Sequence, residues 1–176
     1  MLMQEDGFKE DLICEVMEQV VAHHDALRMV FRPIQSGYSA WNRTTTEDTP
    51  YKLEVIDLRD HCNVEDIVKS KATRIQSNLN INKGPLIRLA LFKCPDGDHL
   101  LISIHHLIID TVSWRILFED IKTGYMQALN NEEILFPKKT DSYKKWAKSL
   151  SIYANSSEIK KEIAEQNPAT KEELAA

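Results

Sequence analysis

Hydrophobic residues along the chain change their spacing at one point. Residues 99–104 are mostly apolar, include two β-branched isoleucines and follow a Pro-Asp-Gly turn, which predicts a buried strand. In residues 111–129 the apolar positions recur every three or four residues, which predicts a helix. Residues 105–110 therefore join a strand to a helix, and Asp110 or Thr111 can cap that helix.

The rest of the chain alternates between helical and strand patterns. We expect helices from about Asp6 to Met29, at 64–79 and at 143–154, and strands at 38–43, 52–58 and 86–93, with a strand stub at Leu2-Met3. This order predicts an α/β fold, a two-layer sandwich in which helices pack on one mixed, mostly antiparallel sheet. Residues 1–155 are expected to form one lobe, and residues 156–176 a polar, partly helical C-terminal tail.

Composition excludes several classes of partner. The chain has 176 residues, 43% of them hydrophobic and 28% charged, which is ordinary for one soluble globular domain. A net charge of −5 without a basic stripe argues against nucleic acid and anionic membranes. Without a signal pattern or an apolar run near the roughly 20 residues of a membrane span, we expect a cytoplasmic protein. Its three cysteines show no metal-binding or redox spacing.

The strand-to-helix joint carries the candidate chemistry. A neutral imidazole can take a proton from a carbon or nitrogen centre and return it, and we assign this role to His106. His105, the next residue along an extended chain, points the other way and fills the space behind the loop. Asp110 can bond the amides at the helix start or pair with an arginine.

Two other kinds of site use the same residues. His99, His105, His106 and Asp110 are all metal-ligand types, but adjacent strand residues face opposite sides and no HExxH motif or cysteine pair accompanies them, so we expect no metal. Ser113 completes a formal Ser-His-Asp set, yet a serine inside a helix lacks the strained turn that activates a nucleophile. Ser113 is better placed to line a cavity.

The joint also carries a family resemblance. Residues 105–121, HHLIIDTVSWRILFEDI, resemble the HHxxxDG signature of the condensation-type domains of nonribosomal peptide synthetases, in the longer form typical of the epimerisation branch. HHDALR at 23–28, GPL at 84–86 and the proline, lysine-threonine and tryptophan pattern of 137–147 resemble further segments of epimerisation domains. The resemblance covers roughly residues 2–155.

This resemblance implies a function and a set of supporting residues. The chain resembles the N-terminal lobe of a chloramphenicol-acetyltransferase-like epimerisation domain, which acts on the α-carbon of an aminoacyl or peptidyl thioester. The phosphopantetheine arm of a peptidyl carrier protein presents that substrate, and no cofactor binds the domain directly. Arg28 is expected to form an ion pair that supports the loop. Thr111 replaces the family glycine at a position that could require positive φ or close substrate approach.

The second lobe of the family, which contributes a glutamate to proton transfer, is expected to be missing from this chain. An isolated lobe would be inactive and would expose an apolar face that favours self-association. Two alternatives to epimerisation remain at this point. One is an amide-forming condensation domain, and the other is an inactive module that docks a carrier protein.

Overall fold

The computed structural model describes residues 1–44, 50–139 and 141–166. They divide into two compact units, Met1–Pro137 and a second unit that begins at Lys138. The helix expected at 143–154 lies in the second unit, whereas the sequence analysis places it in the lobe of residues 1–155. Of the helices in the described part of the chain, none is long and apolar enough to cross a membrane.

In its described residues the first unit contains six strands, three α-helices and a short 3-10 helix, η1. In chain order they are β1 (Leu2–Gln4), α1 (Glu10–His23), η1 (Asp25–Arg28), β2 (Met29–Ile34), β3 (Gly37–Asn42), β4 (Lys52–Asp57), α2 (Val64–Ser77), β5 (Ile87–Cys94), β6 (Gly97–Ile104) and α3 (Thr111–Leu129). The second unit contains α4 (Tyr143–Ala154) and α5 (Ser157–Gln166).

Four strands form the main sheet in the order β1-β6-β5-β4. β6 is antiparallel to both of its neighbours, and β4 is parallel to β5. Cys94 and Gly97 are the last pair of the β5–β6 hairpin, at the Pro-Asp-Gly turn. The expected mixed, mostly antiparallel sheet with helices packed on it is therefore confirmed.

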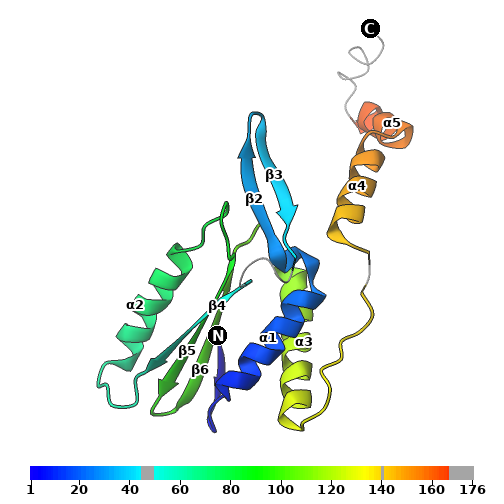
Figure 1. Cartoon of the computed structure of the whole chain (residues 1–176). Helices are drawn as coiled ribbons and strands as arrows, with labels where there is room; N and C mark the ends of the chain where they lie inside the picture. The colour runs from blue at the N-terminus through cyan, green and yellow to red at the C-terminus, as the bar shows by residue number, and fades with distance from the viewer. Residues whose placement is uncertain (45–49, 140, 167–176) are drawn as a thin grey trace. The chain divides into compact units, whose positions relative to one another are not determined.

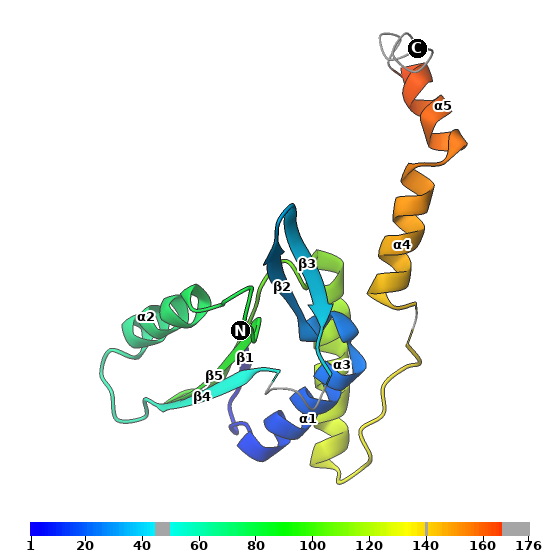
Figure 2. The same cartoon turned by 45° about the horizontal axis from the view of Figure 1, so that its top comes forward.

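Helices cover both faces of this sheet. Side chains alternate along β5: Ile87, Leu89 and Leu91 belong to one apolar cluster, and Ala90 and Phe92 belong to another. The first cluster includes residues of α1 and α3, and the second includes residues of α2. Both views show α2 on one side of the sheet and the α1–α3 pair on the other (Figures 1 and 2). The sheet thus lies between two layers of helices, whereas the sequence predicted only one layer of helices on the sheet.

The first helix is shorter than its apolar pattern predicts. It begins at Glu10, because Gly7 turns the chain with φ 78° and Phe8 N–H is bonded to the Asp98 carboxylate at 2.9 Å. The expected cap at Asp6 is therefore wrong. The helix ends at His23, because His24 has extended backbone angles.

The segment after η1 forms a strand that the sequence did not predict. β2 pairs with β3 as an antiparallel two-stranded sheet, separate from the main sheet. The apolar spacing that suggested a helix up to Met29 continues into η1, which hides the start of β2. Most of the Thr-rich loop expected after β3 falls at residues 45–49, outside the described residues.

Candidate functional site

The loop of residues 105–110, here called the motif loop, leaves the central part of the sheet and enters α3. His105 N–H donates to Leu86 O at 2.9 Å, which extends the strand pairing one residue beyond β6. Ile108 N–H then donates back to His105 O at 3.0 Å, so the chain turns at this point. The root of the loop is therefore fixed by a backbone bond to Leu86, the residue before β5, and by a turn within the loop.

The two histidines of the loop have different surroundings. His105 is half-buried, and its Nδ1 accepts a hydrogen bond from Leu107 N–H at 3.2 Å. In the neutral ring the proton must then be on Nε2, so this bond selects the tautomer. His106 is exposed. Its imidazole is the one that can meet a substrate from outside.

Two buried isoleucines anchor the motif loop in the core. Ile108 and Ile109 are each 6% exposed and belong to the core cluster shared with α1 and α3. Burial of two large aliphatic side chains stabilises their position by roughly 1.5–3 kcal/mol each. The loop is thus anchored on one side and open at His106 on the other.

Asp110 connects the loop to α3 as its N-cap. Its Oδ1 accepts a hydrogen bond from Ser113 N–H at 2.7 Å, and its carbonyl accepts one from Trp114 N–H at 3.1 Å. The bond from Ser113 holds the pKa of the Asp110 carboxyl below its usual range, and the nearby His106 has a smaller effect in the same direction. Asp110 is therefore ionised at neutral pH and bonded to its own helix.

Replacing Asp110 tests this cap. Asp110→Ala is expected to lower the melting temperature at neutral pH, because Ser113 N–H loses its acceptor. The pKa of Asp110 is lower in the folded chain than in the unfolded chain, so its stabilising effect is present above the unfolded value of about 4 and is lost as the pH falls through the folded value. Thermal melts should show the difference from the parent shrinking as the pH falls below the unfolded value of about 4, and a difference that does not change with pH would contradict a charged cap.

The residues that follow Asp110 begin the helix without strain. Thr111 is the exposed first residue of α3. Among the described non-glycine residues Asn131 has a positive φ, and Thr111 does not. The positive φ that this position could require is therefore not adopted in this chain, and close substrate approach stays a prediction. Ser113 is half-exposed, and the Trp114 ring stacks on Phe118 at 5.1 Å between centroids.

Arg28 is the last residue of η1, and its side-chain hydrogen bonds go to α1, to η1 and to the residue after β3. Its guanidinium donates to Val21 O and to Ala22 O, pairs with Asp25 Oδ1 at 2.8 Å and reaches Arg43 O at 3.1 Å. These bonds hold together the end of α1, η1 and the end of β3. The ion pair expected of Arg28 is present with Asp25, and the bonds of this guanidinium support α1.

The four ligand-type residues of the motif region do not converge. His99 lies at the turn end of β6, where its Nε2 is 3.2 Å from the Asp96 carboxylate. His105, His106 and Asp110 lie at the other end of that strand. In the part of the chain that the structure describes, the clusters of ligand-type side chains are His23, His24 and Asp120, and Cys94, Asp96 and His99.

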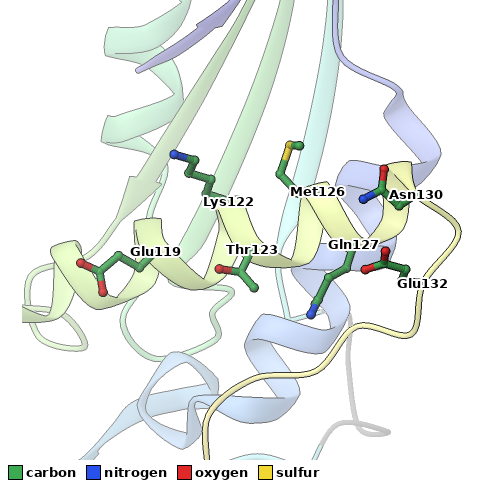
Figure 3. A pocket seen from close by; sticks show the side chains of 7 residues that line it. All are labelled: Glu119, Lys122, Thr123, Met126, Gln127, Asn130 and Glu132. Atoms are coloured by element: carbon green, nitrogen blue, oxygen red, sulfur yellow. The ribbon is translucent and has the colours of Figure 1, made fainter.

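One pocket of the described surface lies on the outer side of α3, away from the motif loop. It has a volume of about 420 Å³ and is open to solvent. Its lining comes from the second half of α3 and the turn that follows (Figure 3): Glu119, Lys122, Thr123, Met126, Gln127, Asn130 and Glu132. This lining contains no histidine and no motif-loop residue, so we do not assign the chemistry to it.

Comparison with known proteins identifies the family. The family model described as "Condensation domain" matches residues 1–164. Tyrocidine synthase 2 of Brevibacillus parabrevis is 47% identical over 164 residues, which are 93% of this chain and 4% of that protein. Bacitracin synthase 2 of Bacillus licheniformis is 46% identical over 162 residues, 92% of this chain and 6% of that protein. The chain thus spans a small fraction of these relatives.

Solved structures agree with this result. The epimerization domain from the third module of tyrocidine synthetase B superimposes with a TM-score of 0.89 at 47% identity, over 93% of this chain and 37% of that one. The first condensation domain of the calcium-dependent antibiotic synthetase has the same fold, with a TM-score of 0.77 at 20% identity over 93% of this chain and 39% of that one. The chain belongs to the condensation-domain family of nonribosomal peptide synthetases.

Proposed function

We propose that this chain is the N-terminal part of an epimerisation-type condensation domain. Its substrate would be an aminoacyl or peptidyl thioester, carried on the phosphopantetheine arm of a peptidyl carrier protein. The observation that carries the proposal is the exposed His106 imidazole on a loop that is anchored on its other side by Ile108 and Ile109. The 47% identity to a solved epimerization domain supports epimerisation over amide formation.

The reaction requires a proton to leave the α-carbon on one face and to return on the other. A neutral imidazole of His106 takes the α-proton, and the electron pair of the C–H bond is delocalised into the thioester carbonyl as an enolate. A proton delivered to the opposite face gives the inverted centre. A second acid on that face is needed, and we assign it to the part of the domain that lies outside the 37% matched here.

The other motif residues position His106. The Leu107 N–H bond fixes His105, and the Ser113 N–H bond occupies the Asp110 carboxylate. A carboxylate bonded to its own helix start stabilises the loop, and we give it no proton-transfer role. We assign Ser113, half-exposed in the first turn of α3, to the wall of the substrate cavity.

Exposed apolar side chains lie in the motif loop and in the first turns of α3. Leu107, Val112 and Ile116 are 51%, 66% and 44% exposed. We propose that this face is covered by the remainder of the condensation domain, and that a chain lacking that cover self-associates through it. No cofactor beyond the arm of the carrier protein is needed for this chemistry.

A hybrid domain tests the function. In it, residues 1–164 of this chain replace the matching segment of the epimerization domain from the third module of tyrocidine synthetase B. Supplied with an L-aminoacyl carrier thioester in D₂O, the hybrid is expected to incorporate deuterium at the α-carbon and to produce the D-epimer, measured by mass spectrometry and chiral chromatography. The unmodified tyrocidine domain is the positive control.

The rival functions give different results in the same assay. An amide-forming domain would leave the α-carbon unlabelled and would yield a dipeptidyl thioester when a second aminoacyl carrier protein is added. A docking module would bind the carrier protein and give neither product. Either result, in a hybrid that melts cooperatively, would reject epimerisation.

A further inference from the structure

The segment His23–Arg28 has no part in the proposed chemistry, yet it makes a polar contact with α3, the helix that follows the motif loop. His24 lies just beyond the end of α1, and its Nε2 is 2.7 Å from Asp120 Oδ2 on α3. The ring N–H donates this hydrogen bond to the carboxylate in the tautomer that carries its proton on Nε2. Asp120 is only 6% exposed, whereas the His24 side chain is 26% exposed.

Asp120 depends on this partner because it is buried. A carboxylate removed from water is costly unless it is hydrogen-bonded or paired. One signal for it is visible in the sequence, an acidic residue on the apolar stripe between Leu117 and Ile121, both of which are buried. His24 in turn is held in place, because Arg28 bonds the carbonyls of Val21 and Ala22 just before it.

The remaining contacts between α1 and α3 are mainly apolar. The two helices pack closely at Gly124, where an added Cβ would lie 3.2 Å from a Val16 methyl group. Apolar packing has little directional preference, so it resists separation of the helices more than sliding. Hydrogen bonds are directional. The bond between His24 and Asp120, together with Lys9 N–H to Tyr125 OH at 2.9 Å, therefore fixes how far α3 lies along α1.

Any shift of α3 is transmitted to the motif loop. Asp120 follows Asp110 by ten residues, which is about 15 Å along one helix. The helix is continuous over that length, and Asp110 caps it while ending the loop that carries His106. The position of α3 along α1, set at Asp120, thus also sets the position of the motif loop.

We infer that His24 and Asp120 are positioning residues for His106: their hydrogen bond sets the register of α3 on α1 and thereby the placement of the motif loop. For catalysis this inference rests on the proposed function. Its structural part does not, since the coupling between residue 24 and the loop exists in the chain without substrate.

The first measurement uses the 176-residue chain alone. In NMR spectra of His24→Ala, the amide signals of His105 and Ser113 are expected to move, because the bonds they make at the two ends of the loop change geometry. His24→Gln keeps a donor for Asp120 and should restore them. The matched control is Ile75→Ala, which removes a buried side chain of α2 on the other face of the sheet and should leave both signals in place. Unmoved signals in His24→Ala would overturn the inference, whatever the activity.

The second measurement uses the hybrid domain. His24→Ala is expected to lower the kcat of α-carbon exchange by between about 10-fold and 100-fold, as displaced catalytic groups do, with little change in KM. His24→Gln should recover most of the rate. Equal losses of kcat in His24→Ala and in Ile75→Ala, at a temperature where both are folded, would show a general stability effect and reject positioning. An inactive parent hybrid would instead count against the proposed function, and the NMR result would still decide the inference.

Discussion

His106→Ala in the hybrid domain is expected to lower the rate of α-carbon exchange by about 100-fold or more, which is the usual loss when a general acid or base is removed. The side chain is exposed on a loop whose anchors, Ile108 and Ile109, are separate residues. Its removal should therefore leave the melting temperature and carrier-protein binding close to those of the parent. Deuterium incorporation, measured from initial rates at saturating carrier thioester, checks the prediction.

His105→Ala is the comparison that distinguishes chemistry from support. His105 is half-buried and accepts a hydrogen bond from Leu107 N–H, so its loss should lower stability together with rate. Exchange that persists in His106→Ala, in protein that melts like the parent, would remove the catalytic assignment and favour a docking module. Thr111 gives no reason to expect weak catalysis through backbone strain, because it has ordinary helical geometry at the start of α3.

The central joint could be predicted from sequence because several local signals agree there. The apolar run of β6, the turn before it, the cap at Asp110 and the helical period of α3 all indicate the same boundary, and α3 begins and ends at the expected residues. The helix expected at 64–79 likewise begins at Val64, with Asn63 as its N-cap residue, although the Asn63 side chain makes no capping bond. The local pattern was sufficient where the residues that begin and end an element are close to it in the sequence.

Other features depend on contacts between distant residues, and no local pattern contains them. The start of α1 is set by Asp98, which is 90 residues away from Phe8. The partner of His24 is 96 residues away on another helix. His24 continues the apolar spacing of α1 in the sequence, but its pairing with Asp120 depends on the packing of α1 against α3. Sequence reasoning therefore placed its candidate residues on the motif loop and did not identify the contact between His24 and Asp120.

Gly97→Ala is expected to destabilise the first unit by between about 2 and 6 kcal/mol, the sum of backbone strain and overpacking. Gly97 has φ +123°, a conformation that residues with a Cβ rarely adopt. An added Cβ would also lie 2.7 Å from Gln4 O and 2.8 Å from Glu5 Cα. Both are backbone atoms at the end of β1, so the methyl group can be accommodated only if β1 moves away from β6. Urea unfolding monitored by circular dichroism measures the loss.

Gly37→Ala separates the two causes of that loss. Gly37 has a similar φ of +134° at the start of β3, but an added Cβ there would have nothing within 4 Å. Its cost should be limited to the backbone strain of about 1–3 kcal/mol, and the excess in Gly97→Ala then measures the collision with β1. Because Gln4 pairs with Asp98, and Asp98 also accepts the bond from Phe8 N–H, Gly97→Ala should additionally speed amide exchange in β1 and at the start of α1. Equal destabilisation by the two substitutions would mean that β1 can move away from the added methyl group without loss of stability. The close approach of β1 to the β5–β6 turn would then contribute little to stability.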